Sequence, residues 1–552
     1  MSALACVWCA CLAAAPENDM QNRPSVSPRA EGPTAKTAPE AWNAVVRDVP
    51  DLPRVLLLGD SISIGYTPFV RAALRGRANV HRPPVNCQAT TRGLAGIKEW
   101  LGAGPWDVIH FNFGLHDLKY VDAKGQNLEK ARGGVQQVPL AAYEQNLSAL
   151  ADTVLRTGAA CIWCATTPVP EGAEYRVAGS ELAYNAAAAK IMQGKGIAIN
   201  DLHAAASARL ATIQQPRNVH FTKEGSRVLA QEVVAHIVRA LARRPYTART
   251  HIAVRGEQWY INDALTYSGA AASGLLMNVR MVNAVFEDAA QPEFDAEANT
   301  NAFLAKIPEY AAHGVRAFTL CLQGGMPGYE GAVNSAFAPD GTLRDPYLAR
   351  VRRVIEACDR AGLAVILGCF YQRQDQILRD EASVRAAVVN AAAWIRDCGF
   401  ANVVLEIANE FGHDGFDHAL IKSPEGEVEL IRLAKKAAPS LLVGTSGLGD
   451  GRLPAAVCEA SDVLLIHFNG TSLQEIPGRI DALKNYGKPI VCNEDDKTAA
   501  DGAAAARVCV AHRASWGCML KEVNQFRPFR FQGAADDPAV YAALEELTMP
   551  RR

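Results

Sequence analysis

Short runs of hydrophobic residues recur along the chain, and most are followed by longer stretches with helical periodicity. In the first half, such runs occupy residues 54–58, 108–113, 160–165 and 196–200. Continuous apolar runs of this length are typical of parallel strands that are buried on both faces. Helical stretches lie between them, and strands that alternate with helices indicate an α/β sandwich with a parallel sheet. We therefore predict one α/β domain over residues 51–244.

The same alternation continues in the second half, after a segment at residues 251–267 that predicts a polar-tipped hairpin. Eight apolar runs follow it, at residues 275–279, 317–322, 364–370, 403–408, 441–445, 463–468, 489–492 and 517–523. Eight strand–helix units in about 280 residues match the size and rhythm of a TIM barrel. We predict this (β/α)8 barrel over residues 245–552.

The composition fits a large globular protein with two or three domains. The chain has 552 residues, 49% of them hydrophobic, and a formal net charge of −2 from 56 basic and 58 acidic residues. The charges are mixed along the sequence without a basic block, which argues against nucleic acid or anionic lipid as a partner. No apolar run approaches the ~20 residues that a membrane-spanning helix needs. The sequence leaves the oligomeric state open.

The first 50 residues predict a targeting segment and a linker. Residues 1–15 contain an apolar run that ends in small residues, as in a secretory signal peptide, although a positively charged start is missing. Residues 16–50 are rich in Pro, Ser, Thr and Ala without periodicity, as a disordered linker is. A secreted or periplasmic protein is therefore expected, and a cytoplasmic protein with a disordered tail is the alternative.

The 14 cysteines form no recognisable metal or redox motif. Cys161 and Cys164 have the spacing of a C-x-x-C pair, but they fall in a predicted buried strand and no second pair is near. Most of the others fall in apolar runs, as small core residues do. We expect neither a metal nor a cofactor.

A serine and a histidine in the first domain have the positions of a catalytic pair. Ser61 follows the first apolar run directly, and His220 precedes the last helix, for which Thr222 is the expected N-cap. Ligands of open parallel sheets bind at the carboxyl ends of the strands, where Ser61 is expected. A nucleophilic serine needs a base within hydrogen-bond reach, and a histidine on a facing loop provides one. A serine after Gly-Asp can also be a simple helix cap, so the pair alone leaves both readings open.

Three blocks together resemble the SGNH/GDSL hydrolases: Gly59-Asp60-Ser61-Ile62-Ser63, Gly114-Leu115-His116-Asp117 and Val219-His220-Phe221-Thr222. The resemblance covers residues 52–243 and implies a flavodoxin-like three-layer fold with esterase or acetylesterase chemistry. It also implies that Ser61 is the nucleophile, that its backbone N–H contributes to the oxyanion hole, and that His220 is the general base. Asp117 is a supporting residue in this comparison.

The sequence departs from that family at three positions. His116 stands where the family has the asparagine that donates to the oxyanion, and Gln88 stands where it has a glycine donor. The acid three residues before the histidine is replaced by Arg217. The group that orients His220 is therefore missing, supplied from elsewhere, or replaced by a backbone carbonyl. A Ser–His dyad can still act, at a lower rate when nothing fixes the imidazole tautomer.

Polar side chains gather at the predicted carboxyl ends of the barrel strands, where barrel enzymes hold their active sites. Each could be a helix cap or a solvated loop residue, but their convergence on one rim indicates a site. They are Arg280, Asn283, Gln323, Tyr371, Gln372, Arg373, Gln374, Asn409, Glu410, His467, Asn469, Asn493, Glu494, Asp495, Asp496, Glu522 and Asn524.

Glu410 and Glu494 follow the fourth and seventh predicted strands, which lie nearly opposite across a barrel mouth. Glycoside hydrolysis needs two such carboxyl groups, and a separation of ~5–5.5 Å would predict retention. With the hairpin ahead of the barrel, these motifs resemble clan A glycoside hydrolases over residues 252–548. The resemblance implies that Glu410 is the acid/base, that Glu494 is the nucleophile, and that Asn409 binds the sugar 2-hydroxyl.

In the same comparison His467 supports the two carboxylates from the sixth strand. The remaining substrate-binding candidates of the rim are Asn469, Tyr371, Arg280 and Glu522.

An ester-cleaving site joined to a glycoside-cleaving site predicts a bifunctional hydrolase of acylated polysaccharide or oligosaccharide. The alternative is an esterase that acts through Ser61 alone, with the barrel as a catalytically silent carbohydrate-binding platform. A general hydrolase of lipids or small esters is a third reading, against which the lack of an apolar lid segment argues. The sugar, the linkage and the acyl group stay open.

Overall fold

The buried apolar runs of the first half form a parallel sheet. The computed structural model describes residues 42–324 and 331–550. Five strands pair in the order β2-β1-β3-β6-β7, all parallel. Their bounds are β1 Arg54–Leu58, β2 Asn79–His81, β3 Val108–Phe111, β6 Ala160–Cys164 and β7 Ala198–Asn200. A short antiparallel pair, β4 Tyr120–Val121 and β5 Val135–Gln136, lies outside this sheet.

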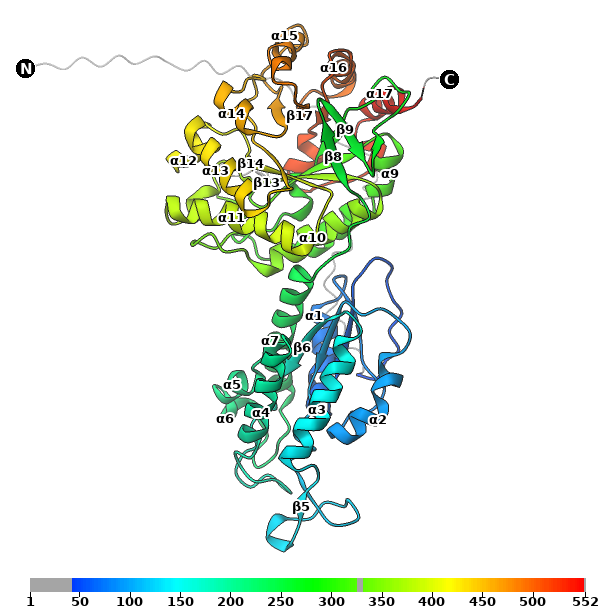
Figure 1. The fold of residues 1–552 in the computed structure, drawn as a ribbon, viewed down its shortest axis with the longest axis vertical. Helices are drawn as coiled ribbons and strands as arrows, with labels where there is room; N and C mark the ends of the chain where they lie inside the picture. The colour runs from blue at the N-terminus through cyan, green and yellow to red at the C-terminus, as the bar shows by residue number, and fades with distance from the viewer. Residues whose placement is uncertain (1–41, 325–330, 551–552) are drawn as a thin grey trace, which may run out of the picture. The chain divides into compact units, whose positions relative to one another are not determined.

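Helices cover both faces of the sheet, so the three-layer α/β/α architecture predicted for this part is confirmed (Figure 1). Helices α1 and α7 pack against each other, and α2, α3 and α4 contact one another in series. The bounds are α1 Ser61–Ala73, α2 Thr90–Leu101, α3 Leu140–Leu155, α4 Glu181–Gly194, α5 Leu202–Ser207, α6 Leu210–Ile213 and α7 Lys223–Arg243. Thr222 is the N-cap of α7, as predicted, and its side chain accepts a hydrogen bond from the backbone N–H of Gly225.

The second half contains a closed barrel of eight parallel strands, counted over the described residues. Six strands pair in the order β15-β14-β13-β12-β11-β18, and β16 pairs with β17. Parallel bridges from Ser446 to Leu465 and from Val491 to Ser515 close the two gaps between these groups. The strands are β11 Asn278–Arg280, β12 Ala317–Cys321, β13 Ala364–Phe370, β14 Val403–Ala408, β15 Leu442–Gly444, β16 Leu464–His467, β17 Ile490–Glu494 and β18 Gly517–Cys518.

Helices follow the barrel strands and surround them (Figure 1). They are α8 Ala296–Leu304, α9 Ile307–Ala312, α10 Asp345–Arg360, α11 Glu381–Cys398, α12 Ala419–Lys422, α13 Pro424–Ala437, α14 Ala455–Ala460, α15 Ile476–Asp481, α16 Ala499–Ala511 and α17 Pro538–Thr548. The alternation of strand and helix confirms the predicted (β/α)8 architecture.

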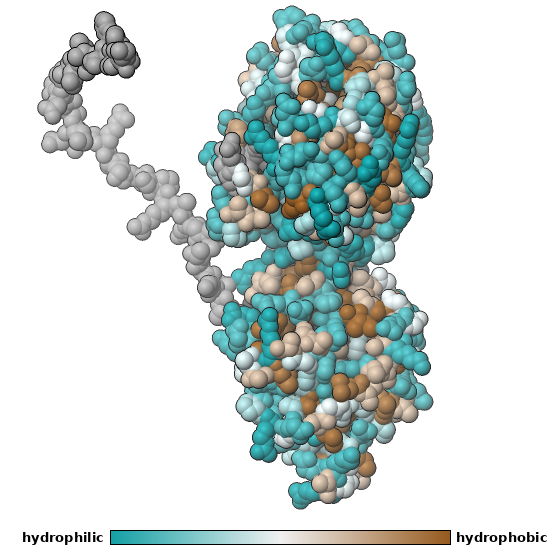
Figure 2. Space-filling model, turned by 90° about the vertical axis from the view of Figure 1, so that its left-hand side faces the viewer, coloured by the Kyte–Doolittle hydropathy of each residue, from teal (hydrophilic) through white to brown (hydrophobic). Residues whose placement is uncertain are grey.

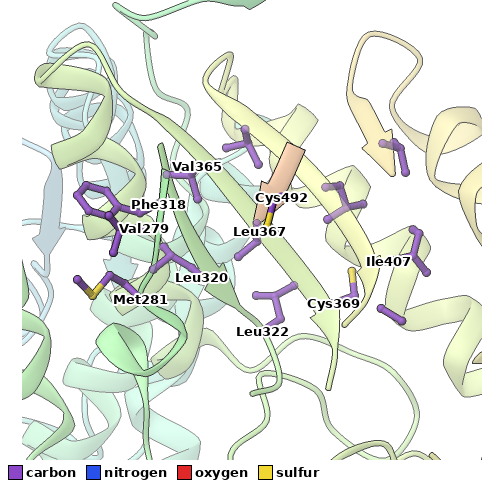
Figure 3. Close-up of a cluster of buried hydrophobic side chains, with 14 of the residues drawn as sticks. Val279, Met281, Phe318, Leu320, Leu322, Val365, Leu367, Cys369, Ile407 and Cys492 are labelled. Carbon is purple, nitrogen blue, oxygen red and sulfur yellow. The ribbon is translucent and has the colours of Figure 1, made fainter. Parts of the chain in front are cut away.

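Along each barrel strand, the side chains point alternately toward the surrounding helices and into the barrel interior. The layer between strands and helices is hydrophobic, as Figure 3 shows for residues such as Leu320, Leu367 and Ile407. The neighbours of these residues on the same strands include Thr319 and Glu406, which are fully buried polar side chains. Because successive side chains of a strand point to opposite faces, this pattern concentrates polar groups inside the barrel.

The hairpin ahead of the barrel forms a three-stranded antiparallel sheet and seals one end of the barrel. Its strands are β8 Ile252–Arg255, β9 Gln258–Ile261 and β10 Ala264–Leu265. The Trp259 side chain is 1% exposed and clusters with Ala317 and Ala364, the first residues of β12 and β13. Trp259 therefore fills the amino-terminal end of the barrel, opposite the end at which the rim residues lie.

Three barrel strands differ from the predicted runs in ways that matter for the site. The first strand begins three residues later than expected and includes Arg280, and the seventh extends to Glu494. The eighth ends at Cys518, and residues 521–525 form a π-helical turn instead of continuing the strand. The prediction that the eighth strand carries Glu522 is therefore wrong: this side chain lies in the turn and is exposed.

The predicted signal segment at residues 1–15 and most of the linker lie outside the described residues. Within the described residues, no helix is long and apolar enough to cross a membrane. On the face drawn in Figure 2, hydrophilic residues cover most of the surface and hydrophobic residues form small scattered groups. Cys161 and Cys164 lie in β6 and are buried, as expected of core residues.

Replacing Trp259 by Ala is expected to destabilise the barrel by about 3–5 kcal/mol, because a large buried side chain would leave a cavity. The free energy of unfolding is measured by urea denaturation, with a spectroscopic signal that reports the unfolding of the barrel. Tyr260→Ala, in the same strand but partly exposed, is the matched control and is expected to cost about 1 kcal/mol or less. Equal losses in the two variants would contradict this role of Trp259.

Candidate functional sites

The first site lies where β1 ends and α1 begins. Ser61 is the first residue of α1, and Asp60 caps the helix by accepting a hydrogen bond from the N–H of Ile62 at 2.9 Å. The Oγ of Ser61 lies 2.9 Å from Nε2 of His220. Since His220 precedes α7 on a different loop, the fold brings together two residues that are 159 positions apart. This is the geometry that activation of a serine by a histidine base requires.

Asn218 orients His220 in place of an acid. Its Oδ1 lies 2.8 Å from Nδ1 of His220 and also accepts the backbone N–H of His220 at 3.0 Å. Arg217, at the position where the resembling family has its acid, is exposed. The third member of the arrangement is therefore an amide two residues before the histidine. An amide oxygen fixes the imidazole tautomer but lacks the negative charge that stabilises an imidazolium ion.

Sequence reasoning missed Asn218 because it tested only the family's position three residues before the histidine. The available signal was an Asn-Val-His tripeptide, since an asparagine side chain can fold back onto the backbone two residues later.

His116 lines the same cavity as Ser61 and His220, and the cavity has a volume of about 700 Å³. Burial lowers the pKa of His116 to about 4, so the imidazole is neutral at pH 7. Its Nδ1 is buried without a hydrogen-bond partner. A neutral imidazole can donate one N–H, so the protonation state of His116 suits the oxyanion donor predicted from the sequence.

Gln88 and Asp117 are the other two residues predicted to support the oxyanion, and each is hydrogen-bonded to a neighbouring residue. Gln88 adopts a left-handed backbone with φ +53°, which explains why a glycine is the ordinary residue here. Its N–H donates to Oδ1 of Asn86 at 3.0 Å and is therefore engaged. Asp117 accepts hydrogen bonds from the N–H and the hydroxyl of Thr90, and burial raises its pKa to about 7. These bonds tie the loop after β3 to the start of α2.

The second site lies at the carboxyl ends of the barrel strands. One carboxylate oxygen each from Glu410 and Glu494 and a ring nitrogen of His467 all lie within 4.8 Å of one another. Glu410 follows β14, whereas His467 and Glu494 are the last residues of β16 and β17. The fold therefore places the two predicted carboxyl groups face to face.

A β-bulge in β17 aims Glu494 into the barrel. Ile466 pairs with Cys492, but His467 pairs with Glu494, so Asn493 is an extra residue on β17. Asn493 is also fully buried, and its amide donates to Glu406 at 3.2 Å. Two consecutive residues thus point inward, which regular alternation forbids and a bulge permits. The sequence pattern could not show this, because the bulge depends on pairing with another strand.

A chain of polar contacts connects the two carboxylates through the barrel interior. Nε of the fully buried Arg280 lies 2.7 Å from Oε2 of Glu494, and its Nη2 donates to Oδ1 of Asn409 at 2.5 Å. Asn409 donates to Gln372 at 3.0 Å, and Gln372 donates to Oε2 of Glu410 at 2.8 Å. Asn409 therefore contacts both Arg280 and Gln372, and Gln372, one of the polar residues expected after the third strand, connects Asn409 to Glu410.

His467 stands between the carboxylates, with Nδ1 3.3 Å from Glu410 and 3.8 Å from Glu494. Burial alone would lower the pKa of His467, but the two carboxylates outweigh burial and raise it. Burial alone would raise the pKa of Glu410, but the hydrogen bond from His467 and the nearby cations lower it on balance. The proton of this pair is therefore held mainly by His467.

Of the other predicted substrate-binding residues, Asn469 and Tyr371 lie against the site groups, whereas Glu522 does not. Asn469 donates to Oε1 of Glu494 at 2.5 Å. The buried Tyr371 ring lies below Arg280, whose Cζ is 5.9 Å from the ring centroid. Glu522, exposed in its π-helical turn, forms no hydrogen bond or ion pair with these groups.

The trio of Glu410, His467 and Glu494 has the donor atoms to hold a metal ion. The guanidinium of Arg280 already neutralises Glu494 at 2.7 Å. A divalent cation would be repelled by that fixed charge, so the arrangement suits proton transfer better than metal binding.

No protein-family model matches the sequence, and no curated protein matches it. Solved structures that resemble this one are of two kinds. An acetyl xylan esterase is 14% identical with a TM-score of 0.28 and covers 33% of this chain and 99% of its own. A lipase/acylhydrolase from Enterococcus faecalis is 17% identical with a TM-score of 0.29, covering 34% and 95%. A glycoside hydrolase family 5 enzyme from Prevotella bryantii is 11% identical with a TM-score of 0.37, covering 51% and 98%.

Replacing Asn218 by Ala is expected to lower kcat for 4-nitrophenyl acetate by about tenfold or more, because His220 loses the group that fixes its tautomer. Asn218→Asp keeps an acceptor at the same place and is expected to retain most of the rate. Asn127→Ala, which also lines the cavity, is the control for a change of its shape. An unchanged kcat in the alanine variant would show that the contact has no part in catalysis.

His467→Gln is expected to change how stability depends on pH. The folded-state pKa of His467 is raised above 6.5. Its stabilising contribution is therefore fully present below about pH 6.5 and is lost as the pH rises through the folded-state value. The Tm advantage of the native protein over this variant should shrink as the pH rises above about 6.5. His251→Gln, at an exposed position, is the control, and a constant Tm difference for His467→Gln would contradict the raised pKa.

Proposed function

We propose that the chain is a hydrolase of acylated polysaccharides or oligosaccharides with two active sites. Ser61 and His220 would remove acyl groups, and Glu410 and Glu494 would cleave glycosidic bonds. The observation that carries the first activity is the 2.9 Å contact between Ser61 and His220. The observation that supports the second is the pair of carboxylates with oxygens within 4.8 Å of each other at the mouth of a barrel.

Ester cleavage would follow the ordinary course for an activated serine. His220 takes the proton of Ser61 while Oγ attacks the acyl carbon, and the alcohol leaves with that proton. Water then attacks the acyl-enzyme with His220 again as the base. Two donors are available for the oxyanion: the Ser61 N–H at the start of α1, where the helix dipole also favours negative charge, and the neutral imidazole of His116.

Glycoside cleavage would use Glu494 as the nucleophile and Glu410 as the acid and then the base. Arg280 and Asn469 both contact Glu494, and these contacts would hold its carboxylate oriented toward the sugar. The short separation leaves no room for a water molecule between the carboxylates and the anomeric carbon, so retention of configuration is expected.

A second candidate function keeps the esterase and leaves the barrel as a carbohydrate-binding platform. One observation favours it: the pKa of Glu410 is lowered, whereas a general acid needs a proton at working pH. The proton would have to pass from His467 to Glu410 when a sugar displaces water from the site.

Matched single variants test the proposal, with acetylated and deacetylated plant polysaccharides as substrates. Ser61→Ala is expected to lower acetate release at least about a hundredfold and to leave sugar release from deacetylated substrate unchanged. Glu494→Gln is expected to do the reverse, because each site has its own nucleophile. Acetate and released sugar are measured on the same samples. The activity that each variant keeps then shows that the variant protein is folded.

Absence of sugar release from every substrate, with acetate still freed in a Ser61-dependent manner, would leave the esterase with a silent barrel. Acetate release that survives in Ser61→Ala would overturn the esterase assignment.

A further inference from the structure

The cavity in front of Ser61 is lined by an excess of positive charge. Lys119, Arg176 and Arg217 line it together with the two histidines, and Glu174 is the one acidic residue among its lining residues. His116 is neutral at pH 7, since its pKa is about 4. The lining therefore carries three cations against one carboxylate, in a protein whose overall formal charge is −2.

None of the three cations forms an ion pair with the residues that the structure describes. Arg176 is fixed by its Nε, which donates to the carbonyl of Leu115 at 2.9 Å, in the loop that carries His116. No ion pair neutralises the guanidinium within the described part of the chain, although the carboxylate of Asp60 acts on it from further away. Glu174, whose backbone carbonyl accepts from Nη1 at 3.4 Å, has an exposed side chain that forms no ion pair in the described part of the chain.

Arg217 lines the cavity and lies against Gly172, which lines it too. Its own φ is +55°, and its Nε lies so close to Gly172 that a Cβ there would be only 2.7 Å away. A side chain at position 172 would therefore displace the guanidinium. The position that carries an acid in the resembling family thus holds a cation that lines the same cavity.

The pKa values of Lys119 and Arg176 are both lowered, as is expected of cations that are partly buried near each other. Burial and, after it, the charge of Arg176 lower the pKa of Lys119. Burial also lowers the pKa of Arg176, although the buried carboxylate of Asp60, the N-cap of α1, acts in the opposite direction. A bound anion would relieve the repulsion between Lys119 and Arg176. A neutral sugar would not.

We propose that the Ser61 cavity takes acyl esters of anionic glycans, in which a carboxylate or sulfate on the sugar pairs with Lys119, Arg176 and Arg217. This inference rests on the proposed esterase function and narrows its substrate class. Guanidinium groups suit both anions, because their donors match two oxygens at once. The cations would raise the rate of encounter and fix the orientation of the sugar, while Ser61 and His220 act on the acyl group.

The test compares three acetylated sugars that differ in the group at C6, two of them anionic and one neutral. They are an O-acetyl methyl glucuronoside, its neutral methyl ester, and an O-acetyl methyl glucoside 6-sulfate. Acetate release is followed for the full chain, with 4-nitrophenyl acetate as an uncharged reference ester. Arg217→Gln and Lys119→Gln are compared with Lys98→Gln, which removes an exposed cation that does not line the cavity.

We expect kcat/KM to be about tenfold higher for at least one anionic sugar than for the neutral ester, and to fall with added salt only for the anionic sugars. Each cavity variant should lose about two- to fivefold of this preference, the size of an exposed charge interaction, when the preference is taken as the ratio of kcat/KM on the anionic sugar to that on the neutral ester. Lys98→Gln should change neither this ratio nor the rate on 4-nitrophenyl acetate. The uronate and the sulfate then tell which anion the cavity prefers.

Equal kcat/KM on all three sugars, with Ser61-dependent hydrolysis of 4-nitrophenyl acetate, would overturn the anionic-substrate inference and leave the esterase proposal standing. If both cavity variants keep the full preference for anionic sugars, the assignment of Lys119 and Arg217 to binding of the anion is wrong. Failure to hydrolyse any of the four esters would overturn the esterase proposal, and this inference with it.

Discussion

Parallel pairing of buried strands is the constraint on which both sites depend. A parallel sheet brings the carboxyl ends of its strands to one edge, and the loops that leave this edge are free to carry polar groups. Ser61 leaves β1 at that edge, and Glu410, His467 and Glu494 leave or end β14, β16 and β17 at the corresponding edge of the barrel. Residues far apart in the sequence meet there because the strands, not the loops, determine their positions.

Both sites carry backbone strain at residues other than glycine. Gln88 and Arg217 beside Ser61 have φ of +53° and +55°, and Glu410 in the barrel has φ of +54°. A left-handed backbone costs about 1–2 kcal/mol for such residues, and the surrounding structure must supply that energy. For Glu410 the backbone N–H donates to Oγ of Ser446 at 3.1 Å, which helps to hold the strained turn. Strain at these positions is consistent with selection for side-chain direction rather than for stability.

The sequence predicted the architecture well because buried parallel strands have a direct signature. The runs at residues 54–58, 364–370 and 403–408 match β1, β13 and β14 residue for residue. Strand β2 was missed because it has only three residues, two of which, Asn79 and His81, are polar, so it forms no apolar run. The eighth barrel strand was drawn too long, since an apolar run cannot distinguish a strand from the start of a helical turn.

The sequence allowed us to predict the reacting groups of the two candidate sites. It was less informative about the groups that support them. Ser61, Glu410 and Glu494 were predicted from their places after strands and His220 from its place before the last helix, together with the two family resemblances. The structure brings each pair together. Asn218 acts through a hydrogen bond to His220, for which the Asn-Val-His tripeptide was the one signal, whereas no spacing rule specifies the hydrogen bonds of Gln372. The inward direction of Glu494 depends on a bulge, and a bulge is a property of two paired strands rather than of one sequence segment.

Charge balance in the barrel connects these supporting groups to the chemistry. Arg280 and a protonated His467 offset the charges of Glu410 and Glu494, so the buried cluster is neutral without a proton on Glu410. A sugar that enters the site expels water, and separated charges become more costly in the drier environment. Transfer of the proton from His467 to Glu410 turns an ion pair into two neutral groups and so becomes more favourable when the sugar is bound. By this argument the general acid forms upon substrate binding, and the low pKa of Glu410 in the empty site is compatible with catalysis.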